Sequence, residues 1–141
     1  MTDTITKPYV ENRISDWTGR LNALFDEVES WVSDSKITIK RSEITQRNED
    51  LMSRFDVAPR MVPTLSLFKD KHRIAFVSSA LWVIGADGRV NITTNDCQYI
   101  LVDMRKDHDT VSDWRVVDPD IRRNTRKFNK TRFRGLLQAN K

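Results

Sequence analysis

Four aspartates at predicted strand ends and turns are the residues best suited to chemistry in this sequence. They are Asp87, Asp96, Asp103 and Asp107. Metal-dependent hydrolases and nucleases gather such carboxylates around a divalent cation. Asp87 and Asp96 are explained by predicted turns, however, and Asp107 by a polar loop. These three residues therefore do not by themselves predict a metal site.

Asp103 is harder to explain, because it follows Leu101 and Val102 on a segment that we predict to be a central strand. A carboxylate in that position needs a partner, such as Arg105, Arg115 or a metal ion. Of these we expect a salt bridge. No Asp…Glu-x-Lys spacing supports a nuclease, so a small metal-dependent hydrolase or nuclease is the least favoured function.

The other reactive side chains do not form a recognisable site. Cys97 stands alone beside Asp96, whose carboxylate would disfavour a thiolate, and we expect Cys97 to be buried on a strand face. His72 and His108 are far apart in the sequence, in polar segments, and are expected to be loop residues. Phosphate-binding glycine motifs are missing. We therefore predict no metal and no cofactor, and the catalytic residues, if any, stay unknown.

Basic residues are concentrated at the C-terminal end of the chain. Residues 120–141 hold eight basic residues and one acidic residue, a net charge of +7, whereas the whole chain carries +4 and the first 119 residues therefore −3. The candidate polyanion-binding residues are Arg122, Arg123, Arg126, Lys127, Lys130, Arg132 and Arg134. Cations pair with phosphates, and the interleaved Phe128 and Phe133 could stack on unpaired bases.

Three interpretations of this basic segment stay open. It can bind nucleic acid or another polyanion, or it can bind an acidic protein. It can also be a solvated helix that docks its Phe and Leu residues on the sheet, or that pairs with the acidic remainder of its own chain. Since the segment is rich in arginine, which suits bidentate phosphate contacts, we place nucleic acid before protein.

A predicted hairpin supplies a second candidate surface. Asp87-Gly88 between alternating apolar runs is a strong hairpin signal, and it would place Val83 opposite Ile92. Trp82 and Ile84 would then lie on the other face of the sheet. If no helix covers that face, the two residues predict a partner interface or a homo-oligomer contact. If the second helix or the tail covers it, they belong to the core.

Helical periodicity is clearest near the N-terminus. Apolar residues from Asn12 to Val32 fall within an arc of about 120°, which predicts a long amphipathic helix. Residues 37–39 read as a short strand and 42–55 as a short helix with few apolar residues. The segment from Ala58 to Pro63 is expected to be extended or turn-like, and it is the best candidate for a loop or hinge.

From Thr64 to Val117 the apolar period changes to two, which predicts consecutive strands. The continuous apolar run from Tyr99 to Val102 is placed near the middle of the sheet. Residues 127–138 predict a short C-terminal helix. The expected fold is α+β: a long N-terminal helix on a meandering antiparallel sheet of about five or six strands, with a globular domain over 1–119 and a basic arm over 120–141.

Composition limits the remaining possibilities. The chain of 141 residues is long enough for one core without disulfides, and its single cysteine excludes an intrachain disulfide and suggests a reducing, cytoplasmic location. We expect no secretory signal and no membrane-spanning segment. The sequence favours a non-catalytic binding or assembly module whose basic arm contacts nucleic acid or another polyanion. The alternative is a protein–protein interaction factor, such as an inhibitor, immunity protein or adaptor, that uses the face around Trp82.

Overall fold

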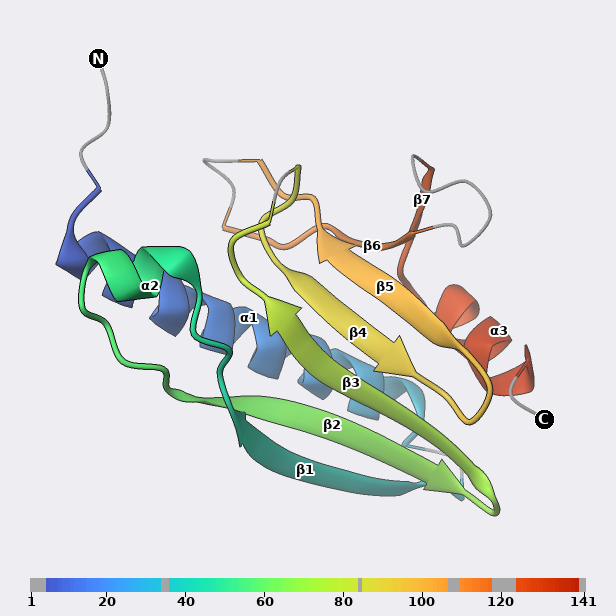
Figure 1. Ribbon diagram of the computed structural model, residues 1–141. Helices are drawn as coiled ribbons and strands as arrows, with labels where there is room; N and C mark the ends of the chain where they lie inside the picture. The colour runs from blue at the N-terminus through green and yellow to red at the C-terminus, as the bar shows by residue number, and fades with distance from the viewer. Residues whose placement is uncertain (1–4, 34–35, 84, 107–109, 118–123, 140–141) are drawn as a thin grey trace.

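Three helices and seven strands make up the fold in the computed structural model, which describes residues 5–33, 36–83, 85–106, 110–117 and 124–139 (Figure 1). The helices are α1 (Lys7–Trp31), α2 (Asp50–Arg54) and α3 (Lys130–Ala139). The strands are β1 (Thr38–Thr45), β2 (Met61–Lys69), β3 (His72–Ala80), β4 (Arg89–Thr93), β5 (Gln98–Asp103), β6 (Trp114–Val117) and β7 (Thr125–Lys127). The predicted α+β class is confirmed, with one strand more than the upper expectation. The predicted domain boundary at 119 lies outside the described residues.

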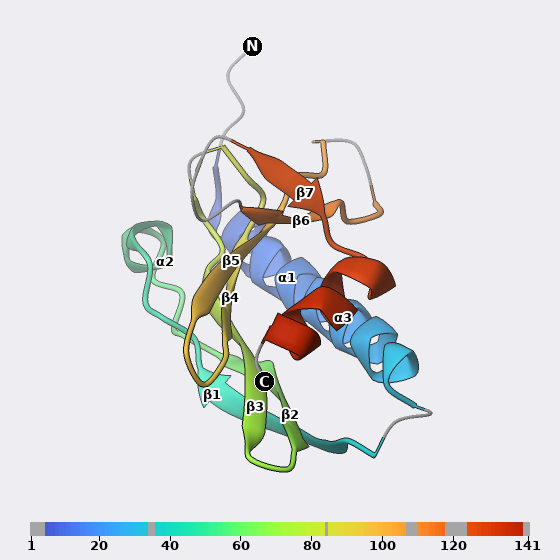
Figure 2. The same ribbon diagram turned by 90° about the vertical axis from the view of Figure 1, so that its right-hand side faces the viewer.

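The sheet is a simple antiparallel meander in which each strand pairs with its neighbours in the chain. It curls around α1, and α3 packs on the same side, so one face of the sheet is lined by these helices (Figure 2). The short α2 lies on the other side, beside the ends of β2 and β3. Within the described residues, none of the helices has the length and apolar character needed to cross a membrane.

α1 starts earlier than its apolar stripe suggests. Thr6 caps the helix by accepting a hydrogen bond from the Tyr9 backbone N–H at 3.2 Å, and a proline in the first turn is compatible with helix initiation. The predicted start at Asn12 was therefore five residues late. The predicted stripe is confirmed, and the buried apolar residues of this helix are Val10, Ile14, Trp17, Leu21, Leu24, Phe25 and Val28.

The segment 42–55 was predicted as one short helix, and this was wrong. β1 continues to Thr45, and α2 covers only Asp50–Arg54. The helical spacing of Ile44, Leu51 and Phe55 was coincidental, because Ile44 is exposed on the edge strand β1. Pro63 lies inside β2 opposite Glu43, so the extended backbone predicted for it is confirmed but the loop is not.

The predicted hairpin register was also wrong. β3 ends at Ala80, and Phe76 rather than Val83 lies opposite Ile92. Between β3 and β4 the chain forms a loop in which Val83 bridges to Ala86 and Gly85 and Gly88 adopt positive φ. This loop folds toward β5, because the Asp87 backbone N–H donates to the Asp103 carbonyl at 2.7 Å. Tertiary contacts thus override the local turn signal.

Register divides the strand residues between two faces, since directly opposite residues point to the same side. The helix-lined face includes Phe76, Ile92 and Tyr99, which lie in one line across β3, β4 and β5. The opposite face, which we call the open face, includes Arg89, Val102 and others treated below. Trp82 belongs to neither face, because it lies in the β3–β4 loop.

Candidate functional site

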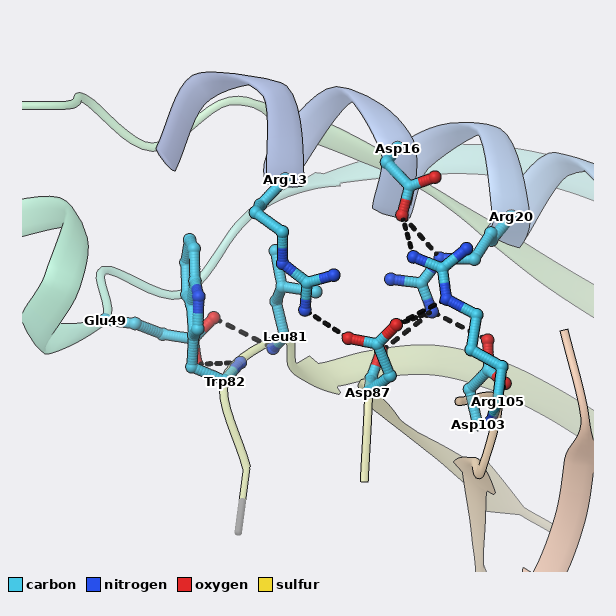
Figure 3. A network of polar contacts seen from close by, with 9 residues as sticks. All are labelled: Arg13, Asp16, Arg20, Glu49, Leu81, Trp82, Asp87, Asp103 and Arg105. Atoms are coloured by element: carbon cyan, nitrogen blue, oxygen red, sulfur yellow. Dashed lines mark hydrogen bonds and ion pairs between the residues drawn. The ribbon is translucent and has the colours of Figure 1, made fainter. Parts of the chain in front are cut away.

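A network of six charged side chains joins α1, the β3–β4 loop and the end of β5 (Figure 3). We call it the Arg–Asp network, and its members are Arg13, Asp16, Arg20, Asp87, Asp103 and Arg105. Three arginines balance three aspartates, so the network carries no net charge. Sequence reasoning singled out Asp87 and Asp103 but missed the residues on α1.

Asp103 is fully buried at the centre of this network. Its Oδ2 accepts a hydrogen bond from Arg20 Nη1 at 2.7 Å, and its Oδ1 accepts from the backbone N–H groups of Arg105 and Asp113 at 3.1 and 2.8 Å. The expected salt bridge exists, but its partner is Arg20 on the helix rather than the side chain of Arg105 or Arg115. Because three donors already occupy its oxygens, Asp103 has the environment of a structural carboxylate.

Asp87 receives arginines from two elements. Arg13 of α1 donates to one of its oxygens and Arg105 to the other, while Arg20 Nη1 lies 3.9 Å away. Burial by itself would raise the pKa of the Asp87 carboxyl, but the hydrogen bonds from Arg13 and Arg105 and the charges of Arg13 and Arg20 lower it below its ordinary value. Asp87 therefore not only lies in the β3–β4 loop but also, as a carboxylate, joins that loop to Arg13 of α1 and to Arg105.

The missed residues had a signal in the sequence. Arg13 and Arg20 are two helical turns apart and border the apolar stripe of α1 on the same side. Arg20 is only 6% exposed, and its guanidinium lies 4.8 Å from the centre of the Trp17 ring. A cation at the edge of a core-facing stripe needs a buried anion, and Asp103 supplies it. The network therefore clamps α1 onto the sheet and is best explained by stability.

The other candidate chemical residues are not brought together. Cys97 is exposed in the turn before β5, so the expected burial was wrong. Its backbone instead exchanges hydrogen bonds with Thr94 in that turn. Asp96 is exposed nearby, whereas Asp107 and His108 lie outside the described residues. Over the described ranges, no three His, Cys, Asp or Glu side chains form a group that could hold a metal ion.

Trp82 is half-buried and packs against the core from the β3–β4 loop. Glu49, just before α2, accepts hydrogen bonds from the backbone N–H groups of Leu81 and Trp82 at 2.9 and 3.0 Å and so holds this loop in place. Trp82 lines a hollow of about 470 Å³ together with residues that include Arg47 and Arg89. Ile84 lies outside the described residues. A partner contact at Trp82 stays a prediction.

The basic C-terminal segment is anchored by its apolar residues. Phe133 is fully buried and Phe128 is 6% exposed, and both rings pack against Trp31 with centroid distances of 5.7 and 5.4 Å. The two phenylalanines are therefore not available to stack on bases, and that part of the nucleic-acid hypothesis was wrong. Asn129 caps α3 by accepting a hydrogen bond from the Arg132 backbone N–H at 2.9 Å.

The cations of the same segment point away from the core. We call Lys127, Lys130, Arg132 and Arg134 the C-terminal cations, and all four are exposed. Among the residues that the structure describes, none of them forms an ion pair with a carboxylate. Arg126 is also exposed but is engaged in an interaction of its own. Arg122 and Arg123 lie outside the described residues.

Comparison of the chain with protein-family models, with curated proteins and with solved structures finds no match.

Proposed function

We propose that this chain is a small binding module that contacts a polyanion, with nucleic acid as the first candidate, through its C-terminal cations. The observation that supports the proposal is that, in the described part of this segment, the apolar residues are buried while the basic residues are exposed. Phe128 and Phe133 hold it on the core, while Lys130, Arg132 and Arg134 extend into solvent without a described carboxylate partner. Exposed cations attract phosphates and release counterions when they bind them.

The Arg–Asp network supports a binding role rather than a catalytic one. Its aspartates are engaged by arginines and backbone N–H groups, so they are poorly placed to bind a metal or move a proton. The cytoplasmic location suggested by the single cysteine is part of the proposal. An acidic protein is the alternative partner, because it would use the same cations.

The test measures binding of a labelled 20-nucleotide single strand by fluorescence anisotropy over a range of salt concentrations. The test variant combines Lys130→Gln, Arg132→Gln and Arg134→Gln. Losing three phosphate contacts lowers the slope of log K against log salt by about 2, since each contact contributes about 0.7 for single strands. The affinity at low salt falls with it.

The matched control combines Lys7→Gln, Lys69→Gln and Lys71→Gln, which removes three exposed cations from elsewhere on the chain. If the control weakens binding as much as the test variant, net charge rather than the C-terminal cations determines binding. If the wild-type chain shows no salt-dependent binding, the proposed function is wrong.

A further inference from the structure

The open face of the sheet has a one-sided charge. Its side chains follow from the strand register, and the basic ones are Lys40, Arg73, Arg89, Arg115 and Lys127. Among the strand residues that the structure describes, no carboxylate lies on this face. The two carboxylates within strands, Glu43 and Asp103, lie on the helix-lined face. The strand carboxylates thus lie on one side of the sheet, whereas strand cations lie on both, with Arg41, Lys69 and Arg126 on the helix-lined face.

Three of these cations stand in one line across the strands. Arg89 of β4 lies opposite Val102 of β5, Val102 lies opposite Arg115 of β6, and Arg115 lies opposite Lys127 of β7. We call Arg89, Arg115 and Lys127 the cation row. With about 4.8 Å between neighbouring strands, the row spans about 14 Å. It ends at Lys127, which is also one of the C-terminal cations.

The charges of the row are only partly compensated. Arg115 Nε donates to Asp113 at 3.0 Å, and both side chains are more than a third exposed. In the described part of the chain, Arg89 Nε is buried without a hydrogen-bond partner, and Lys127 has no ion pair. Arg89 also lines the 470 Å³ hollow next to Trp82, so its end of the row adjoins open space, which Glu49 and Asp50 line as well.

We infer that the cation row binds the phosphates of a single-stranded nucleic acid that crosses strands β4 to β7. This inference rests on the proposed function and extends it from the C-terminal cations onto the open face. The half-buried Ile100 and Val117 flank the row and offer apolar contact to sugars and bases. The charge pattern favours an anionic occupant, because the strands of this face bring no carboxylate against it. Of the carboxylates that neighbouring loops and α2 bring near the row, Asp113 pairs with Arg115, Asp50 pairs with Arg54, and Glu49 accepts from backbone N–H groups.

The shape of the face selects a single strand over a duplex. Because the sheet curls around α1, the open face is its convex side (Figure 2). A duplex is stiff over about 150 base pairs and would touch a convex surface only briefly, whereas a single strand bends over it. A second copy of this chain is a poor occupant, since a two-fold contact would place the cations of one face against those of the other.

The experiment compares Arg89→Gln/Arg115→Gln with a charge-matched control, Lys40→Gln/Lys71→Gln. Lys40 is on the open face but at the opposite edge, and Lys71 lies in the β2–β3 turn. In the anisotropy assay, the row variant lowers the salt slope for a single strand by about 1.4, which corresponds to two lost contacts. The control leaves the slope unchanged. Circular dichroism melts of both variants check that they fold.

A second variant tests the role of Arg115 by an expected increase in affinity rather than a loss. Asp113→Asn removes the carboxylate beside Arg115 but keeps the backbone N–H that donates to Asp103. We expect several-fold tighter binding of the single strand. An unchanged or weaker affinity contradicts a role for Arg115 in binding.

Other results would overturn the inference in distinguishable ways. If the row variant behaves like its control while the C-terminal variant loses binding, the proposed function stands and the row is wrong. If only the row variant loses binding, the row stands and the assignment to α3 fails. Tighter binding of a 20-base-pair duplex, or equal displacement of the oligonucleotide by poly-L-glutamate, overturns the single-stranded assignment.

Discussion

Replacing Arg20 by Met should lower the free energy of unfolding by about 3–5 kcal/mol, because it breaks a buried ion pair and leaves one partner behind. Arg20 is 6% exposed and Asp103 is fully buried, so water cannot replace the lost hydrogen bond of 2.7 Å. The Asp87 carbonyl also loses its donor from Arg20, at 2.7 Å. Methionine fills similar space, so the loss reports polar contacts more than a cavity.

The expected change is large enough to measure by two methods. For a chain of this length, 1 kcal/mol corresponds to roughly 3–4 °C in Tm, so the variant should melt about 10–20 °C below the wild type. Urea unfolding followed by tryptophan fluorescence gives the free energy directly. Trp17 and Trp114, with ring centroids 5.8 Å apart, report loss of the core around the network.

Two further variants make this test specific. Arg54→Met removes an exposed arginine that pairs with Asp50 at 2.9 Å within α2, and it should cost less than about 0.5 kcal/mol. The double variant Arg20→Met/Asp103→Asn removes both charges and keeps an Oδ1 that can accept from the backbone N–H groups of Arg105 and Asp113, so it should recover part of the stability lost in Arg20→Met. A loss below about 1 kcal/mol in Arg20→Met would refute the view that the network clamps α1 to the sheet.

Two predictions concern glycine and pH. Gly88 has a φ of +133°, and a Cβ at this position would lie 2.3 Å from the Trp17 ring, so Gly88→Ala should lower the free energy of unfolding by about 2–4 kcal/mol. A Cβ at Gly19 would meet no atom within 4 Å, so Gly19→Ala should raise the free energy of unfolding by about 0.5–1 kcal/mol. Urea titrations measure both changes. Because the pKa of Asp87 is lowered by folding, its contribution is complete above the unfolded pKa of about 4 and is lost as the pH falls through the folded pKa. Urea titrations from pH 5 to pH 3 should therefore show a shallower fall in stability for Asp87→Asn, and an equal slope would contradict the assigned ion pairs.

Local sequence patterns predicted most of the secondary structure. The apolar stripe of α1 and the alternation from Thr64 to Val117 both persist in the fold, because burying one face of a helix or strand imposes a period that the chain carries locally. The α+β meander followed from the order of these elements. β7 was missed because Thr125–Lys127 is short and polar and becomes a strand only by pairing with β6.

The candidate sites depended more on tertiary structure. Asp103 was predicted to need an arginine, but the partner came from 83 residues away on α1 rather than from its own neighbourhood. Phe128 and Phe133 are interleaved with basic residues, which suggested that they could stack on bases, yet they pack with Trp31 in the core. A charge or an aromatic ring can be satisfied by several partners, and packing selects among them.

By itself the sequence determined the elements, the sign of the C-terminal charge and the need of Asp103 for a partner, since each of these follows from composition or from contacts between near neighbours. Only the tertiary structure decided the partner of Asp103, the path of the β3–β4 loop and the alignment of Arg89, Arg115 and Lys127. These features join segments far apart in the chain. They depend on strand register and on helix docking, and the spacing of residues that are close in the sequence determines neither.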